Sequence, residues 1–204
     1  MTTFCSQICE QGFAVARMAV GAGRRRSRVR PVPIEIHAMG PYWEPNTQER
    51  TPLGELVASA KDGGDREALD ELCRLFAAWV GELDLAAGAS VVAVPDAPGR
   101  GGHPVRALTD AVAGRLGVAA VSALIRRHST APVRETPPDE RPALVATAGF
   151  EVAADVAGAH IVLVDDVTLT GSTLDHLARL LESAGAASVV AVVAARTRRA
   201  ELAD

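Results

Sequence analysis

The sequence predicts an α/β fold with a mostly parallel central sheet flanked by helices. Short apolar segments typical of buried strands alternate with amphipathic segments of helical period. Strands that alternate with helices are joined by right-handed crossovers, which place them in a parallel sheet. The 204 residues, 48% of them hydrophobic and 23% charged, are enough for one ordinary globular domain with a single core.

The N-terminal part of the chain predicts an extension in front of that domain. Residues 1–30 contain six arginines and one glutamate, although the whole chain has a net charge of −4. We expect a solvated or disordered extension here, and the alternative is a contact with nucleic acid or phosphate. The folded domain is then expected to span residues 31–204.

The first half of the domain predicts strands and helices in order along the chain. Residues 32–36 alternate apolar side chains with Pro and Glu, as in a short edge strand. Residues 53–60 predict a helix, and residues 66–80 predict a strongly amphipathic one. Residues 91–94 predict a short buried strand, and residues 105–116 a helix that follows a Gly-rich loop. The apolar face of the second helix consists of Leu69, Leu72, Cys73, Phe76 and Val80.

The second half continues the alternation around one long loop. Residues 126–142 are polar and Pro-rich, which indicates a long mobile loop. Residues 174–184 predict a helix that stops at Gly185. Strands are expected over residues 118–124, 143–152, 161–164 and 189–194.

Composition excludes several classes of protein. Three cysteines cannot form a disulfide framework, and no apolar run reaches the length of a membrane span, so we expect a cytoplasmic protein. Aromatic residues make up only 3%, which disfavours a surface that stacks single-stranded nucleic acid. The sequence contains no phosphate-binding P-loop, no dinucleotide fingerprint and no nucleophile elbow.

Two carboxylates and a hydroxyl-rich loop follow the strand predicted at residues 161–164. Asp165 and Asp166 are expected where that strand emerges, and the loop then enters a helix. Ligands of open α/β sheets bind beyond the carboxyl ends of strands, and a helix N-terminus favours a phosphate. The carboxylates offer acceptors for vicinal hydroxyls, directly or through a divalent ion. The phosphate cradle and the diol acceptors together indicate a ribose 5-phosphate group. The loop consists of Val167, Thr168, Leu169, Thr170, Gly171, Ser172 and Thr173.

A simple capped helix is the structural alternative for this segment. Thr170 or Ser172 as an N-cap would explain the hydroxyl groups. It would not explain two adjacent carboxylates at the end of a buried strand, where paired charge is costly. We therefore favour a binding site.

The segment resembles the phosphoribosyl-pyrophosphate signature of the type I phosphoribosyltransferases. The match covers Asp165, Asp166, Val167, Thr170, Gly171 and Thr173, and it departs at Leu169, where many members have Thr and purine-salvage members often an acidic residue. The resemblance implies binding of 5-phosphoribosyl 1-pyrophosphate with Mg²⁺, without assigning a protein ligand to the metal. It also implies transfer of the phosphoribosyl group to a nitrogen acceptor with release of pyrophosphate.

The resemblance assigns a role to each part of the site. Asp165 and Asp166 would be the catalytic carboxylates that hold the ribose hydroxyls, and residues 167–173 would hold the 5-phosphate. Arg100 and Gly101, in a Gly-rich loop after a strand, would contact the pyrophosphate. Lys61, the only lysine of the chain, would contact it as well.

Further segments resemble the ComF family of phosphoribosyltransferases over about residues 42–197. They include residues 91–95 with the Arg100–His103 loop, and residues 148–152. This resemblance implies a flexible hood loop over residues 126–142 and a homodimer. The alternative is a regulator that senses 5-phosphoribosyl 1-pyrophosphate or a nucleotide without catalysis, or a ComF-like accessory protein of DNA uptake. Cys5 and Cys9 lack the spacing of that family's zinc module, so no zinc site is expected.

Overall fold

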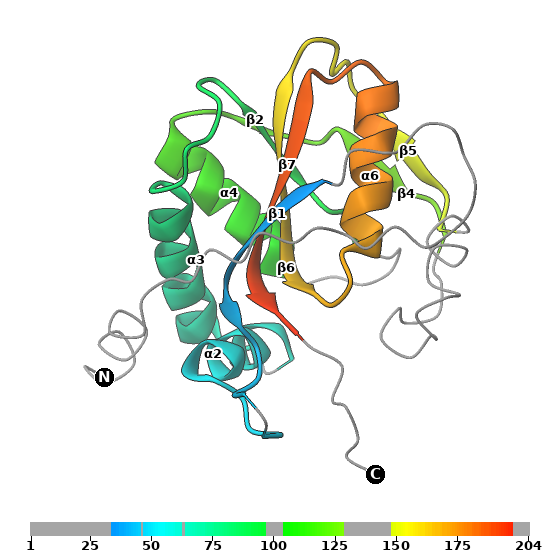
Figure 1. Ribbon diagram of the computed structural model, residues 1–204. Coiled ribbons are helices and arrows are strands. Elements are labelled where there is room, and N and C mark those ends of the chain that lie inside the picture. The colour runs from blue at the N-terminus through cyan, green and yellow to red at the C-terminus, as the bar shows by residue number, and fades with distance from the viewer. Residues whose placement is uncertain (1–33, 46, 63, 97–103, 129–147, 198–204) are drawn as a thin grey trace.

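A five-stranded, fully parallel sheet forms the centre of the computed structural model (Figure 1). The structure describes residues 34–45, 47–62, 64–96, 104–128 and 148–197. The strand order is β1-β7-β6-β2-β3. The strands are β1 (Glu35–Pro41), β2 (Ser90–Ala93), β3 (Ala120–Val121), β6 (His160–Thr168) and β7 (Ser188–Arg196).

Helices cover both faces of the sheet, which confirms the predicted fold class. Three of them, α2 (Pro52–Lys61), α3 (Arg66–Val80) and α4 (Pro104–Leu116), lie on one side, and α6 (Ser172–Ser183) lies on the other (Figure 1). Helix α2 begins at Pro52 behind the N-cap Thr51, whose hydroxyl accepts a hydrogen bond from the Gly54 N–H. Helix α3 begins behind Asp65, whose carboxylate accepts from the N–H groups of Glu67 and Ala68.

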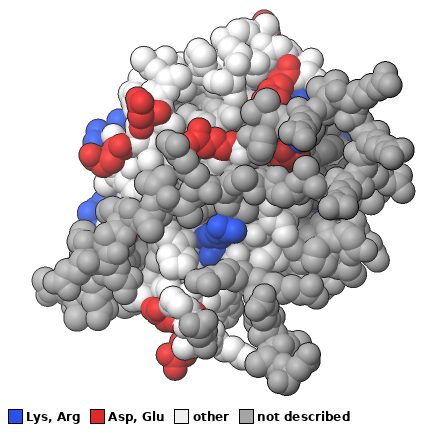
Figure 2. Space-filling view, viewed as in Figure 1, with Lys and Arg blue, Asp and Glu red and all other residues white. Residues whose placement is uncertain are grey.

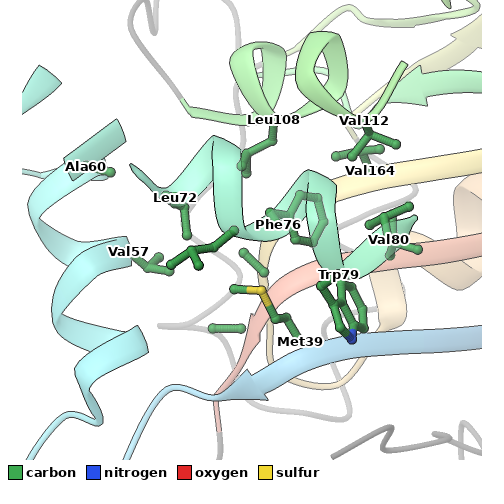
Figure 3. Packing of buried hydrophobic residues seen from close by; sticks show 14 of the residues in the cluster. Met39, Val57, Ala60, Leu72, Phe76, Trp79, Val80, Leu108, Val112 and Val164 are labelled. Carbon is green, nitrogen blue, oxygen red and sulfur yellow. The ribbon is translucent and has the colours of Figure 1, made fainter. Parts of the chain in front are cut away.

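Each face of the sheet has its own apolar core. On the first face Phe76 and Trp79 of α3 pack with Met39 of β1 and Val164 of β6 (Figure 3). On the second face Leu174, Leu177 and Leu181 of α6 pack against the other side of the strands. Because the central strands are buried on both faces, they appear in the sequence as continuous apolar runs.

The predicted helices and the long apolar strands are confirmed, with bounds that shift by a few residues. The edge strand expected over residues 32–36 is present as β1, which covers Glu35–Pro41, and residues 32 and 33 lie outside the described part of the chain. The strand extends to Pro41 because of its parallel pairing with β7 in a register that joins Glu35 to Val190 and Pro41 to Arg196. This tertiary partner is what sets the bounds of the strand, and local composition does not reveal it.

The single strand expected over residues 118–124 is wrong. Strand β3 ends at Val121, and the chain then leaves the main sheet to form β4 (Leu124–Arg126). Strand β4 pairs antiparallel with β5 (Phe150–Val152) in a separate two-stranded sheet. This pairing also takes Arg126 out of the expected loop. The rest of that loop from residue 129, and residues 143–147 of the expected strand 143–152, lie outside the described residues.

The connections of β2 and β6 diverge, which makes this pair of strands the switch point of the sheet. These two strands are neighbours, with Ala93 of β2 opposite Val164 of β6. From β2 the chain passes through α4 to β3, whereas from β6 it passes through α6 on the other face to β7. Ligands of open α/β sheets bind beyond the carboxyl ends of the strands at such a switch point.

Cys73 packs against the first core, as its position on the predicted apolar face of α3 indicates. Burial raises the pKa of its thiol to about 11, so the thiol stays protonated and unreactive at neutral pH. Within the described ranges, no helix has both the length and the apolar character to cross a membrane. On the face shown in Figure 2, the described acidic and basic side chains form small separate groups.

Candidate functional site

The two carboxylates lie inside the C-terminal part of β6. The apolar run predicts a strand that ends at Val164, with both carboxylates beyond it, but β6 continues to Thr168. The extension follows from pairing with β7, where Asp165 lies opposite Val193 and Thr168 opposite Arg196. Successive side chains of a strand point to opposite faces. The extended strand therefore presents Asp165 and Asp166 to opposite sides of the sheet.

Asp166 forms a largely buried ion pair with Lys61. The Lys61 ammonium at the end of α2 donates to Asp166 Oδ2 at 2.5 Å, and only 4% of the Asp166 side chain is exposed. The other oxygen, Oδ1, accepts from the Val167 N–H at 2.6 Å. The fold thus brings together two predicted site residues that are 105 positions apart in the sequence.

We expect Lys61→Met to destabilise the fold, because it removes the ammonium group that pairs with the buried Asp166 carboxylate. Lys61 is itself 26% exposed, so water compensates in part, and the expected loss is about 1–3 kcal/mol of unfolding free energy. Urea unfolding measures it. Adding Asp166→Asn to this variant removes the buried charge that Lys61 compensates in the wild type and should recover most of the loss. A double variant as unstable as Lys61→Met would contradict the pairing.

The pKa of Asp165 is raised well above its usual range. Burial against the surrounding protein is the main cause, and the neighbouring Asp166 carboxylate adds to it. The Asp166 N–H donates to Asp165 Oδ1 at 2.9 Å, and together with Lys61 it opposes this rise in pKa. A costly carboxylate at a strand end is typical of a functional position.

We expect Asp165→Asn to stabilise the fold at neutral pH. The raised pKa means that the folded protein binds the Asp165 proton more tightly than the unfolded chain does. The stability that this proton contributes is fully present below the unfolded pKa of about 3.9, and it is lost as pH rises toward the folded pKa. Asparagine does not ionise, so the variant does not lose this stability as the pH rises. The melting temperature of the variant should therefore match the wild type near pH 4 and exceed it at pH 8. The same change at exposed Asp84 is the control, and an equal gain there would contradict the explanation.

The loop after β6 leads directly into α6 at a glycine with a left-handed backbone. Gly171 is the N-cap residue, with φ of 75°, and no side chain caps the helix. The N-cap is therefore neither Thr170 nor Ser172, although the Thr170 hydroxyl accepts a hydrogen bond from the Ser172 N–H at 3.4 Å and lies 2.8 Å from the Ser172 hydroxyl. The Gly171 N–H donates to the Thr168 hydroxyl at 3.2 Å. A helix N-terminus that begins at a glycine and is surrounded by hydroxyl groups is suited to an anion.

The predicted pyrophosphate residues are described only in part. Arg100 and Gly101 lie outside the described residues. Their loop follows β2, whose last residue, Ala93, lies opposite Val164, directly before the two carboxylates on β6. Lys61 is the helix-terminal partner of Asp166 described above, which brings its ammonium to the same edge of the sheet as the carboxylates.

A group of residues on the β7 side of β6 was not predicted from the sequence. The Trp43 indole N–H, just after β1, donates to the hydroxyl of Thr197, just after β7, at 2.9 Å. Tyr42 lies edge-on to Trp43 with ring centroids 5.0 Å apart. The Arg50 guanidinium lies 5.6 Å from the Trp43 ring centroid. Arg196 ends β7. The sequence did contain one signal for Arg196, which directly follows an apolar run. The carboxyl ends of parallel strands share one edge of the sheet, so this position indicates that Arg196 lies near the carboxylates of β6.

A family model and several solved structures match this chain. The model described as the phosphoribosyl transferase domain matches residues 98–204. Adenine phosphoribosyltransferase from Leishmania tarentolae is 17% identical, with 78% of this chain and 81% of that chain covered and a TM-score of 0.41. Orotate phosphoribosyltransferase from Aeropyrum pernix is 24% identical over 64% of this chain and 60% of that chain, with a TM-score of 0.39.

Larger proteins match over part of their length. Phosphoribosylpyrophosphate synthetase from Mycobacterium smegmatis is 21% identical, with a TM-score of 0.40. The match covers 61% of this chain but only 33% of the synthetase. A search of curated proteins found no match.

Proposed function

This chain belongs to the phosphoribosyl transferase domain family, and from that premise we propose that it binds 5-phosphoribosyl 1-pyrophosphate and transfers its phosphoribosyl group to a nitrogen acceptor. One observation supports the proposal most strongly. Strand β6 presents two carboxylates and then enters α6 through Gly171, beside β2 at the switch point of the sheet. Carboxylates that can accept hydrogen bonds from the ribose hydroxyls are thus followed directly by a helix N-terminus that can bind the phosphate.

The 5-phosphate would bind at the N-terminus of α6. Gly171 adopts a φ of 75° and lacks a side chain, so the backbone can approach a phosphate closely. Thr170, Ser172 and Thr173 would add hydroxyl donors. The positive end of the helix dipole stabilises the charge of the phosphate.

The ribose hydroxyls would bind the carboxylates of Asp165 and Asp166. Mg²⁺ is commonly held by one or two carboxylates together with phosphate oxygens of the substrate and several waters. Because Asp165 and Asp166 point to opposite sides of the sheet and Asp166 is paired with Lys61, one of the two carboxylates would bind the ion, and phosphate oxygens and waters would supply its other ligands. When bound, the ion would neutralise charge on the departing pyrophosphate.

The pyrophosphate would lie on the β2 side of the site. We propose that Arg100 and Gly101 contact it, and that the Lys61 ammonium contacts it from α2. The acceptor nitrogen would form a bond to ribose C1 while the bond from C1 to the pyrophosphate oxygen breaks. Pyrophosphate would leave with that electron pair, and the acceptor's proton would pass to water.

A screen for pyrophosphate release tests this function. The full-length protein, 5-phosphoribosyl 1-pyrophosphate and Mg²⁺ are incubated with nitrogen bases and amines one at a time. We expect release that depends on one class of acceptor and on Mg²⁺. Release at the acceptor-free rate with every compound would contradict a transferase function.

A non-catalytic sensor is the second candidate, and Leu169 favours it. The resemblance would place a hydroxyl or an acidic side chain at this position of the loop, and leucine offers neither. Binding of 5-phosphoribosyl 1-pyrophosphate without pyrophosphate release would support the sensor. We further propose the ComF family as the subgroup and a homodimer as the assembly; mass measurement in solution tests the dimer.

A further inference from the structure

Lys61 and Asp166 form an ion pair whose two sides differ in their access to solvent. The Asp166 side chain is 4% exposed, whereas the Lys61 side chain is 26% exposed. Asp166 is fixed on a central strand, and its Oδ1 accepts from the Val167 N–H. Lys61 is the last residue of α2, which packs beside β1 and β7 (Figure 1). The ammonium can therefore leave this contact for water or for a ligand without any movement of the strand that carries the carboxylate.

The use of lysine at this position also favours a contact that can be exchanged. Lys61 is the only lysine among the 21 lysine and arginine residues of the chain. Arg74 and Arg179 each hold a carboxylate by two hydrogen bonds, from Nε and from a terminal nitrogen. The Lys61 ammonium donates to one carboxylate oxygen, Asp166 Oδ2. An ammonium is a point charge on a flexible stem, so it changes partners more readily than a guanidinium that is held at two points.

A cation that is paired with Asp166 opposes the binding of a second cation there. Carboxylate oxygens are ligands that Mg²⁺ and Mn²⁺ take in proteins, and Asp165 and Asp166 are adjacent on β6. With Lys61 in contact, a divalent ion at Asp166 must displace the ammonium or bind beside it against Coulomb repulsion. The ion pair therefore lowers the affinity of Asp166 for a free divalent ion.

A substrate with several phosphate groups reverses this balance. The phosphate oxygens of 5-phosphoribosyl 1-pyrophosphate offer the ammonium an acceptor in place of Asp166. Once Lys61 has changed partners, Asp166 can accept Mg²⁺ or the ribose hydroxyls. Substrate and metal thus favour each other, and this coupling is reciprocal, because the factor that the substrate adds to metal affinity equals the factor that the metal adds to substrate affinity.

We propose that Lys61 is a removable counter-ion, which keeps divalent cations off Asp166 until 5-phosphoribosyl 1-pyrophosphate draws the ammonium away. Metal and substrate then bind together, and the metal alone binds weakly. The inference rests on the proposed binding of 5-phosphoribosyl 1-pyrophosphate. It gives the Lys61 ammonium two alternative partners, the Asp166 carboxylate in this structure and the pyrophosphate group in the proposed function.

Binding of Mn²⁺ without substrate tests the proposal. Mn²⁺ replaces Mg²⁺ as the probe, and electron paramagnetic resonance measures the free ion in the presence of the full-length protein. Lys61→Met removes the ammonium, and Lys61→Gln removes the charge but keeps a donor, which serves if the methionine variant does not fold. We expect both variants to bind Mn²⁺ about tenfold or more tightly than the wild type, a factor within the usual range of coupling between two ligands.

Two further variants locate the effect. Arg50→Gln is the matched control, because Arg50 precedes α2 and its guanidinium lies 3.2 Å from the carboxylate of Glu55 in the first turn of that helix. This change also removes one positive charge and one ion pair of α2, and it should leave the Mn²⁺ affinity at the wild-type level. Adding Asp166→Asn to Lys61→Gln should abolish the gain in Mn²⁺ affinity, because the carboxylate that Lys61 protects is then absent.

Calorimetric titration with 5-phosphoribosyl 1-pyrophosphate, with and without Mg²⁺, measures the coupling itself. In the wild type, we expect Mg²⁺ to raise the affinity for the substrate strongly. In Lys61→Gln, the factor by which Mg²⁺ raises this affinity should fall by about tenfold, since linkage requires it to fall as the affinity for the metal alone rises.

The outcomes separate this inference from the proposed function. The role of Lys61 would be overturned by equal Mn²⁺ affinities in the wild type and the Lys61 variants, by an equal gain in Arg50→Gln, or by a gain that survives Asp166→Asn. An unchanged effect of Mg²⁺ on substrate affinity in Lys61→Gln would overturn it as well. In each of these cases the wild type still binds 5-phosphoribosyl 1-pyrophosphate, and the proposed function stands. Failure of the wild type to bind this substrate with Mg²⁺ would overturn both.

Discussion

Replacing Asp165 and Asp166 together by asparagine is expected to abolish pyrophosphate release while the fold persists. The two carboxylates are the proposed acceptors for the ribose hydroxyls, and one of them would also bind Mg²⁺. Removing a single group that stabilises a transition state commonly costs about a hundredfold to a thousandfold in rate. For the pair, we expect a loss of at least about a thousandfold.

The fold should survive this change for two physical reasons. Neutralising Asp165 removes a charge that burial disfavours, as its raised pKa indicates. Lys61, which loses its partner, is 26% exposed and remains partly solvated. Circular dichroism and the melting temperature verify the fold of the variant. Turnover equal to that of the wild type would remove the carboxylates from the mechanism.

Replacing Gly171 by alanine is expected to weaken the binding of 5-phosphoribosyl 1-pyrophosphate. The new methyl group would stand between the backbone and the phosphate at the start of α6. Loss of one hydrogen bond to a charged group costs about 1.5–3 kcal/mol, or about tenfold to a hundredfold in affinity. Calorimetric titration measures the change.

Gly158→Ala is the matched control for this substitution. Gly158 has a φ of 72°, close to the 75° of Gly171, and a side-chain carbon there would meet no atom within 4 Å. Both variants should lose about 1–2 kcal/mol of stability from the left-handed backbone. Only Gly171→Ala should bind 5-phosphoribosyl 1-pyrophosphate more weakly than the wild type. Equal affinities in the two variants would contradict the phosphate site.

The sequence was sufficient to predict the elements that hold the site. Strands β6 and β7 are buried on both faces, so their apolar runs identify them without knowledge of the partners. The two carboxylates and the loop that enters α6 are contiguous, and they form a recognisable unit within one stretch of sequence. Helix α3 is signalled by its apolar face and by its capping residue Asp65.

The remaining features depend on contacts between distant segments. The pairing of Lys61 with Asp166 spans 105 positions, and its geometry depends on how α2 packs beside the sheet. The departure of β4 from the main sheet depends on its partner β5. Arg196 has no motif around it, and it becomes significant only once β7 is placed beside β6.

Calorimetric titration of the full-length protein with 5-phosphoribosyl 1-pyrophosphate, with and without Mg²⁺, tests the central claim most directly. We predict tight binding that requires Mg²⁺ and that is lost in the Asp165→Asn, Asp166→Asn double variant. Absence of binding under both conditions would contradict the proposed site.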